Sequence, residues 1–312
     1  MSELLPVIEA LLEETHAARP AALCAIVKTR GSTPQAAGAA MLVRSDMSTI
    51  GTLGGGCVEA EVCKRAFEML QKGQGGVLSF TLDHDFGWDD GLVCGGAIDV
   101  AITPFEANAA GRLESLVADL RDRSGGSLDL PVTHEGRRQV YRLLLEPSAR
   151  LLIAGAGHVG HAVALLAVQL DFQVTIVDDR ADFVARERFP AGVELIAGDI
   201  GRTLRRLPID ADTYVVIVTR GHRHDREALA AVVERDAAYV GMIGSRRKSK
   251  LILRELAEGG VSVERLERVH TPIGLPIRAV TVAEIAISIA AELVKVRRQR
   301  RPTLVEGPFE LV

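Results

Sequence analysis

The sequence predicts an α/β protein: a smaller N-terminal α/β (α+β) domain, followed by a C-terminal Rossmann-like domain with a doubly wound parallel sheet. The chain has 312 residues, which is enough for two domains of ordinary size. From residue 150 onward, short apolar strands alternate with helical or turn-rich segments, a pattern typical of a parallel sheet covered by helices. The first of these strands leads directly into a glycine motif that is typical of dinucleotide-binding folds.

The N-terminal domain is predicted from hydrophobic periodicity and from turn residues. The expected elements are helices at 2–18, 57–71 and 107–123, strands at 21–29, 39–44, 77–82 and 97–105, a turn-rich stretch at 124–131 and a hairpin-like segment at 132–147. The alternation of strands and helices begins just after this hairpin. We therefore expect the boundary near Pro147, between a first domain at 1–147 and a second at 148–312.

The C-terminal domain begins with an apolar strand that leads into the motif GAGHVG, residues 155–160. Gly155 permits a sharp turn, Gly157 lets the backbone approach a pyrophosphate, and Gly160 allows close packing of helix and strand. The motif, which includes His158, opens a helix whose N-terminus offers free N–H groups to a phosphate. The alternative is that the glycines only tighten the turn of a domain that binds no dinucleotide.

Asp178 ends the next predicted strand, at a position where an acid can hold the hydroxyl groups of a ribose. Arg180 follows two residues later and leaves the preference between NAD and NADP open. An NAD(P)-dependent oxidoreductase is therefore an alternative function for this chain. Against it, we find no clear constellation of residues for hydride transfer.

Two polar clusters follow later strands of the same domain, at strand ends where open α/β sheets place ligands. TRGHRHD, at 219–225, contains Arg220 and His222 and is either a metal-binding loop or a solvated polar turn. In GSRRKSK, Ser245 is the expected N-cap of a helix that begins with Arg246 and Arg247. A helix N-terminus disfavours cations, so the two arginines are unfavourable there unless a bound anion compensates their charge. The alternative is a basic solvent-facing surface.

Composition and charge limit the kinds of binding partner that are expected. The formal net charge is −4 and aromatic residues make up 4% of the chain, so neither nucleic acid nor an anionic membrane is expected as the main partner. The acidic N-terminus does not resemble a secretory signal, and glycines interrupt the uncharged stretch 151–170, so no membrane span is expected. The four cysteines lack zinc-ligand spacing and are expected to be reduced thiols in the cytoplasm, with Cys24 in the core.

Two loops place a cysteine beside glycines in the N-terminal domain. In TLGGGCVEAEV, the triplet Gly54, Gly55 and Gly56 precedes Cys57 at the start of a predicted helix, with Glu59 in the first turn. Such a helix start favours the thiolate form of a nearby thiol and forms an anion-binding nest. The second loop, VCGG, contains Cys94, and the two loops suggest one pocket. The alternative for each cysteine is a buried and unreactive thiol.

The sequence resembles the xanthine dehydrogenase accessory proteins of the XdhC/CoxI type, over nearly the whole chain and in the family's order. GGGCVEAEV and MIGSRRK are the most specific of these motifs. The matching stretches are RGSTPQAAGAAMLV (30–43), GTLGGGCVEAEV (51–62), DDGLVCGG (89–96), IAGAGHVG (153–160), VDDR (177–180), DTYVVIVTRGHRHD (212–225), YVGMIGSRRK (239–248) and PIGLPIRAVTVAEIAISIAAELV (272–294).

This resemblance implies a chaperone of the molybdenum cofactor (molybdopterin), and not a metabolic catalyst. Such a protein binds the cofactor, protects it while a cysteine desulfurase installs its terminal sulfido ligand, and delivers it to an apo molybdenum hydroxylase of the xanthine dehydrogenase type. Cys57 and Cys94 become candidates for a transient molybdenum contact or for sulfur handling. The Rossmann domain becomes a candidate cradle for the pterin phosphate or a nucleotide extension, and a homodimer is expected.

The sequence departs from the family pattern at a few positions. Gln35 stands where an arginine is common, and Pro276 and Arg278 replace an acid and a glycine. These departures weaken any inference about anion contacts at Gln35 and in the loop 272–280. A sulfur carrier that uses Cys57 as a persulfide site is a third hypothesis.

Overall fold

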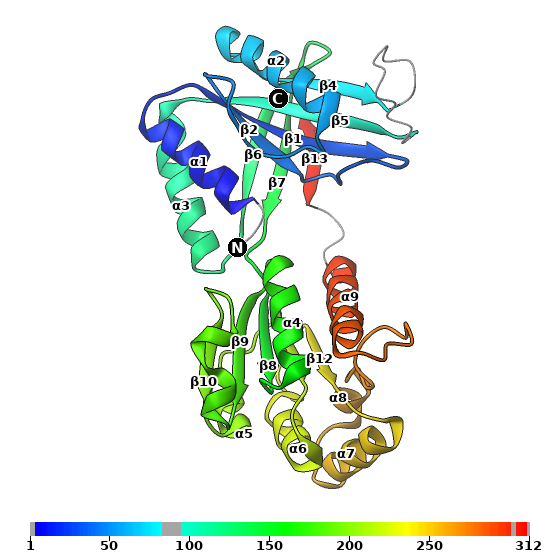
Figure 1. The fold of residues 1–312 in the computed structure, drawn as a ribbon. Helices are drawn as coiled ribbons and strands as arrows, with labels where there is room; N and C mark the ends of the chain where they lie inside the picture. The colour runs from blue at the N-terminus through cyan, green and yellow to red at the C-terminus, as the bar shows by residue number, and fades with distance from the viewer. Residues whose placement is uncertain (1–3, 83–94, 301–303, 311–312) are drawn as a thin grey trace. The chain divides into compact units, whose positions relative to one another are not determined.

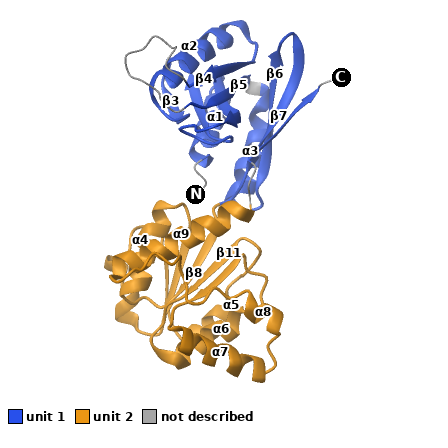
Figure 2. Cartoon of the chain, turned by 90° about the vertical axis from the view of Figure 1, so that its right-hand side faces the viewer, with its two compact units in different colours: residues 1–147, 302–312 blue, residues 148–301 orange. Residues whose placement is uncertain are grey.

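The fold is described from a computed structural model, which covers residues 4–82, 95–300 and 304–310 (Figure 1). The chain divides into two compact units, which we name unit 1 (residues 1–147 with 302–312) and unit 2 (residues 148–301) (Figure 2). Among the described residues, no helix combines the length and the apolar character that crossing a bilayer requires.

Unit 1 is built on an eight-stranded sheet with the order β13-β7-β6-β4-β5-β1-β2-β3. Most neighbouring strands are antiparallel, and β4 and β6 are parallel. The strands are β1 (Ala21–Arg30), β2 (Ala40–Arg44), β3 (Thr49–Gly51), β4 (Gly76–Thr81), β5 (Ala97–Phe105), β6 (Gly126–His134), β7 (Arg137–Leu145) and β13 (Val305–Glu310), and the helices are α1 (Leu5–His16), α2 (Gly56–Lys72) and α3 (Ala110–Arg121).

Helices cover both faces of this sheet, as β1 illustrates. Leu23 and Ala25 belong to a core shared with α1 and α3, whereas Cys24 and Ile26 belong to a second core that includes Val58 of α2. Successive side chains of a strand point to opposite faces, so a continuous apolar run can fill both cores. The helix α2 is thereby anchored on one face of the sheet, with its first residues at the glycine triplet.

Three strands of unit 1 differ from the expectation, and the first is the short β3, where no strand is expected. The turn-rich stretch at 124–131 is for the most part strand, because β6 begins at Gly126 and pairs with β7 from Gly126 to His134. The C-terminal residues form β13, which pairs with β7 beginning at Val305 opposite Leu143 (Figure 1). No local pattern near residue 305 indicated this strand, whose partner lies about 160 residues earlier in the chain.

Unit 2 is a five-stranded parallel sheet with the order β10-β9-β8-β11-β12, which confirms the predicted doubly wound fold. Side chains on β8 again alternate between two cores, one shared with α4 and α9 and the other with α5 to α8. The strands are β8 (Arg150–Ala154), β9 (Gln173–Asp178), β10 (Glu194–Ala197), β11 (Thr213–Ile217) and β12 (Tyr239–Met242), and the helices are α4 (His158–Gln169), α5 (Ile200–Arg206), α6 (Gly221–Val232), α7 (Arg246–Glu258), α8 (Val263–Glu267) and α9 (Val282–Arg300).

The strand order determines where a ligand can bind in unit 2. The chain runs outward from β8 to β10 on one side and then returns to β11 on the other side of β8. In such sheets, ligands bind at the carboxyl ends of the strands, where the order reverses. Between β8 and β11, this point coincides with the glycine motif at 155–160.

Candidate functional site

The glycine triplet of unit 1 adopts backbone conformations that favour glycine. The φ angles of Gly54, Gly55 and Gly56 are 115°, 82° and 69°. A Cβ atom at Gly54 would lie 2.8 Å from Cβ of Pro34, whereas a Cβ at Gly55 or Gly56 would meet no atom of the described residues within 4 Å. The triplet therefore packs on one side and leaves open space on the other, directly before the half-buried Cys57 at the start of α2.

Glu59 holds the triplet in place. Its Oε1 accepts hydrogen bonds from Thr52 Oγ1 at 2.6 Å, from the Leu53 backbone N–H at 2.7 Å and from the Gly55 N–H at 2.8 Å. Burial raises the pKa of Glu59, but these hydrogen bonds outweigh that effect and hold its pKa below the ordinary value. The carboxylate thus fixes the loop that precedes Cys57.

We expect Glu59→Ala to destabilise the triplet by about 2 kcal/mol, since charge-assisted hydrogen bonds and a helix cap are lost. Hydrogen exchange of residues 49–57 should become faster in this variant. Glu61→Ala is the matched control, because Glu61 forms only an exposed i,i+4 pair with Arg65 and should change the stability by less than about 0.5 kcal/mol. Equal exchange in the two variants would show that Glu59 does not hold the loop.

The segment Gly31–Pro34 connects the two glycine loops of unit 1. Ser32 forms a parallel bridge with Gly95, the residue that follows Cys94 in the chain. A Cβ atom at Gly96 would lie 2.1 Å from the carbonyl oxygen of Ser32, so the two backbones are in close contact. The other end of the segment, Pro34, packs on Gly54. One segment therefore contacts both loops, although Cys94 itself lies outside the described residues.

The described cysteines differ in exposure. Cys24 is fully buried in the core, as predicted, and burial raises its pKa. Cys63, one and a half turns of α2 beyond Cys57, is half-buried against the same core, and burial raises its pKa as well. Among these three thiols, only Cys57 lies at the open glycine triplet.

The glycine motif of unit 2 contains two tightly packed glycines and one open glycine. Gly155 has a φ of 110°, and a Cβ there would lie 2.5 Å from the carbonyl oxygen of Val218. A Cβ at Gly160 would lie 1.9 Å from the carbonyl oxygen of Gly155, whereas one at Gly157 would meet nothing within 4 Å. Gly157 and the exposed His158 therefore form the accessible N-terminus of α4.

Asp178 is engaged within the protein. It is 1% exposed, and its two oxygens accept hydrogen bonds from the Ala156 N–H at 2.7 Å and from the backbone and guanidinium of Arg180 at 2.8 to 3.0 Å. Burial raises the pKa of Asp178, but the bonds from Arg180 and Ala156 lower it to about 2. The sequence predicts that this carboxylate holds ribose hydroxyls; in the structure it fixes the glycine turn and pairs with Arg180.

The cluster at 219–225 is connected by ion pairs to neighbouring segments. Arg220 pairs with Asp179 at 2.6 Å, and His222 Nε2 lies 3.1 Å from a carboxylate oxygen of Glu255. Asp225, which is fully buried, accepts hydrogen bonds from Thr219 and from Lys248. Across the described parts of the chain, no group of three His, Cys, Asp or Glu residues could hold a metal ion, so the structure does not support the metal alternative for this loop.

The basic residues of the second cluster stand at the start of α7. Ser245 caps this helix, as predicted, and its Oγ accepts a hydrogen bond from the Lys248 N–H. The side chains of Arg246 and Arg247 are exposed and form no hydrogen bond or ion pair with any part of the chain that the structure describes. Their guanidinium groups are thus available to an anion at the carboxyl edge of the sheet.

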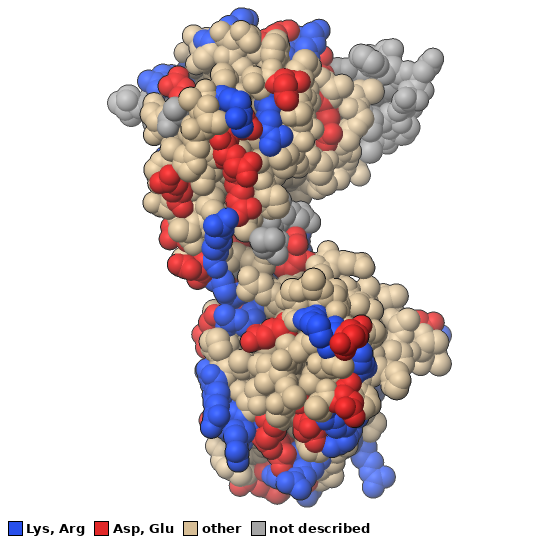
Figure 3. Space-filling model, turned by 60° about the vertical axis from the view of Figure 1, so that its left-hand side comes forward, with Lys and Arg blue, Asp and Glu red and all other residues tan. Residues whose placement is uncertain are grey.

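Charge elsewhere on the surface is mixed. On the face drawn in Figure 3, lysine and arginine side chains are interspersed with acidic ones over the described residues. This distribution is consistent with the small net charge of −4. A site for an anionic guest therefore has to be sought in local geometry, as at the two glycine loops and the start of α7.

The fold and the site define a class of protein that joins a glycine-cysteine loop to a Rossmann domain. The model for the XdhC and CoxI family matches residues 15–81, and the model for the XdhC Rossmann domain matches residues 151–293. The chain belongs to the XdhC and CoxI family, as its motifs predicted.

The chain is similar over most of its length to proteins of known sequence or structure. YqeB of Escherichia coli (strain K12), an uncharacterized protein, is 34% identical over 300 residues, which cover 96% of this chain but 47% of YqeB, so the chain spans about half of that protein. PaoD of the same organism, a molybdenum cofactor insertion chaperone, is 28% identical over 298 residues, covering 92% of this chain and 86% of PaoD. The crystal structure of a xanthine dehydrogenase from Bacillus halodurans shares the fold, with a TM-score of 0.81 at 23% identity over 96% of this chain and 97% of that one.

Proposed function

We propose that this protein is a chaperone of the molybdenum cofactor. It protects the cofactor while a cysteine desulfurase supplies the sulfur of the terminal sulfido ligand, and then delivers it to an apo molybdenum hydroxylase of the xanthine dehydrogenase type. The relationship to PaoD supports the insertion role. The observation that carries the proposal is the open glycine triplet before Cys57, held by the same segment, 31–34, that contacts the second glycine loop.

The donor set at this loop suits a molybdenum centre with sulfur ligands. Molybdenum bound to dithiolene sulfur is a soft centre, for which a thiolate is an appropriate ligand. Cys57 is only half-buried, and the adjacent Gly55 and Gly56 leave open space for a guest. The N-terminus of α2 adds backbone N–H groups that favour an anion. The protein must later release its cargo. One or two such contacts therefore suit it better than a closed cage of four ligands.

For unit 2, we propose a role in binding phosphate, either of the pterin or of a nucleotide extension. Gly157 and the start of α4 are accessible at the point where the strand order reverses. Arg246 and Arg247 at the start of α7 supply positive charge at the same edge. The engagement of Asp178 by Arg180 makes a nicotinamide dinucleotide the less favoured ligand, because its ribose would have to displace that ion pair.

Pterin content tests the proposal directly. The protein is purified without oxygen from cells that make the cofactor, as wild type and as Cys57→Ala, Cys94→Ala and Cys63→Ala, and bound pterin and molybdenum are measured. We expect Cys57→Ala to lower the bound pterin by at least about tenfold, since a direct ligand is lost. Cys63→Ala is the matched control from the same helix and should keep the wild-type content.

Two outcomes would contradict the proposal. A wild-type protein without pterin would exclude the chaperone function. Equal loss in Cys57→Ala and Cys63→Ala would mean that damage to the fold of α2, and not a specific contact, causes the effect. We also expect a homodimer in solution, which light scattering of the same preparations would check.

A further inference from the structure

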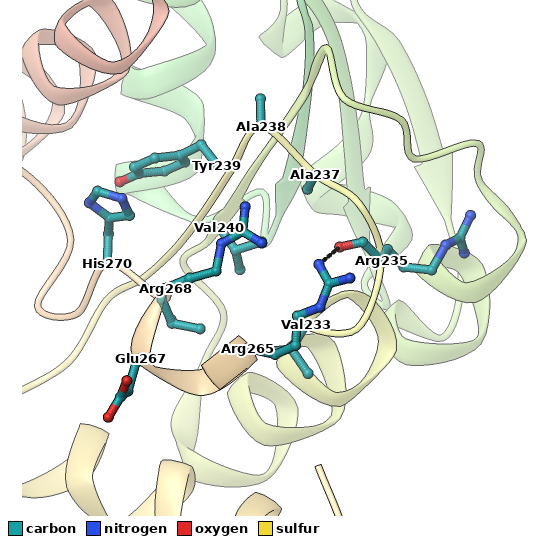
Figure 4. Close-up of a pocket in the computed structure, with 11 residues that line it drawn as sticks. Val233, Arg235, Ala237, Ala238, Tyr239, Val240, Arg265, Glu267, Arg268 and His270 are labelled. Carbon is teal, nitrogen blue, oxygen red and sulfur yellow. Dashed lines mark hydrogen bonds between the residues drawn. The ribbon is translucent and has the colours of Figure 1, made fainter. Parts of the chain in front are cut away.

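A cavity of about 320 Å³ lies in unit 2 at the amino end of β12 (Figure 4). This is the opposite end of the strand from Arg246 and the start of α7. The walls come from the segment after α6, from the first residues of β12 and from α8 with the residues that follow it. Neither the glycine motif nor the glycine-cysteine loop contributes to it, so the cavity is separate from the sites described above.

Two guanidinium groups line this cavity with little compensating charge. Arg265 donates a long hydrogen bond of 3.4 Å to the carbonyl oxygen of Arg235, and the nearest carboxylate, of the 78% exposed Asp236, is 3.9 Å away. The side chain of Arg268 forms no hydrogen bond or ion pair with any described residue. Figure 4 shows both guanidinium groups reaching into the space between α8 and the segment 235–240, while the carboxylate of Glu267 points away.

One wall of the cavity is held rigidly. The ring of His270 lies 4.5 Å from the ring of Tyr239, and its Nδ1 is 3.2 Å from Oε1 of Glu292. The same carboxylate accepts hydrogen bonds from the hydroxyl group of Tyr239 and from the Gly274 N–H. Glu292 fixes both rings on the α9 side of the sheet, so the chain at residues 239 and 270 that borders the cavity is held in place without a ligand. This lowers the entropic cost of binding one.

The chemistry of the walls defines a class of ligand. Two neighbouring guanidinium groups repel each other, and an oxyanion bound between them removes this electrostatic repulsion. The planar guanidinium also matches the geometry of a phosphate group especially well. The rest of the lining includes Val233, Val240 and Val269. A cavity of this size is larger than a phosphate ion and falls in the range of small-molecule sites. The walls therefore suit a phosphate group that carries an organic part.

We propose that this cavity binds a small phosphate monoester, with Arg265 and Arg268 holding the phosphate and the valine side chains contacting the organic group. The site is independent of the proposed cofactor chaperone function. If the protein carries no pterin, the proposal of a phosphate monoester site is not affected. If the cavity binds no phosphate monoester, the proposal of a chaperone function is not affected.

The probes are inorganic phosphate and phenyl phosphate, titrated into the full chain by calorimetry at constant ionic strength, with chloride as the non-specific anion. We expect phenyl phosphate to bind more tightly than inorganic phosphate, and chloride not to compete. Arg268→Gln and Arg265→Gln should each weaken phenyl phosphate binding by about tenfold, the effect of one charge-assisted hydrogen bond. Arg254→Gln is the matched control, since Arg254 is exposed on α7 and pairs only with Glu258.

Hydrogen exchange identifies which edge of the sheet is occupied. Phenyl phosphate should protect residues 233–240 and 263–270, and Arg247→Gln, at the opposite edge, should leave that protection unchanged. The proposal is overturned if the wild type binds neither probe, or if Arg268→Gln and Arg254→Gln bind equally well. Protection confined to residues 155–160 and 244–250 would overturn it as well, because the ligand would then occupy the carboxyl edge alone.

Discussion

Replacing Gly160 by alanine is expected to destabilise unit 2 by about 3 kcal/mol or more, which is among the largest effects for a single added methyl group. The added Cβ would lie 1.9 Å from the carbonyl oxygen of Gly155. That oxygen belongs to the turn after β8 and cannot rotate away as a flexible side chain would. The start of α4 must therefore move off the sheet, and the core that it shares with β8 loosens.

Gly157→Ala is the matched control for this prediction. The φ of Gly157 is −66°, which alanine adopts readily, and a Cβ there meets nothing within 4 Å. Its unfolding free energy should stay within about 0.5 kcal/mol of the wild type. Urea unfolding followed by hydrogen exchange of peptides from unit 2 measures both variants. A Gly160→Ala protein as stable as Gly157→Ala would show that the helix and strand are not closely packed at this point.

Asp178→Asn is expected to cost about 3 kcal/mol of unfolding free energy in unit 2, because it breaks a buried ion pair with Arg180. The amide cannot accept all the hydrogen bonds that the carboxylate receives from Ala156 and Arg180. The loss should loosen the turn at the glycine motif, since Asp178 bonds directly to Ala156. Faster hydrogen exchange at residues 154–160 would be the local sign of this change.

The contribution of Asp178 also depends on pH. Its pKa is lowered from 3.8 to about 2 in the folded protein, so the folded state favours the charged form. This stabilisation, about 2 kcal/mol, is fully present above the ordinary pKa and is lost as the pH falls from about 5 to about 2. The difference in unfolding free energy between wild type and Asp178→Asn should therefore shrink over this range.

Asp179→Asn controls for a general effect of removing a carboxylate. Asp179 is the next residue, and its ion pair with Arg220 lies at the surface. Surface pairs contribute less than about 1 kcal/mol, so this variant should resemble the wild type at every pH. If the two variants lose equal stability, the buried pair at Asp178 has no special role.

Much of the fold was predictable because its signals are local. The periodicity of hydrophobic residues and the positions of turn residues predicted the strands and helices of unit 2, and with them the doubly wound sheet. The capping box at the start of α9 is another local signal, because Thr281 and Glu284 exchange backbone and side-chain hydrogen bonds. Each of these signals depends on residues fewer than five positions apart, which is the range over which a sequence can be interpreted without a structure.

The features that the sequence did not predict are contacts between segments far apart in the chain. The strand β13 has an unremarkable local sequence and exists because β7 offers an edge to pair with. Gly31 and Gly96 are also far apart in sequence, and their contact requires β1 and β5 to be neighbours. The glycines in RGST and VCGG were the available signal, since a glycine can mark a close approach of two backbones. Even so, a glycine does not reveal which backbone approaches it.

The candidate residues divide in the same way. The sequence alone determined the glycine triplet before Cys57 and the basic start of α7, because each resides in a short contiguous motif. It also determined the fold class and the family, because alternating strands and helices and a series of such motifs follow one another along the chain. Only the tertiary structure decided that Asp178 forms an ion pair with Arg180 and that Asp225 forms one with Lys248. The physical reason is that a motif specifies which groups are present, whereas hydrogen-bond partners and burial depend on how the strands are ordered.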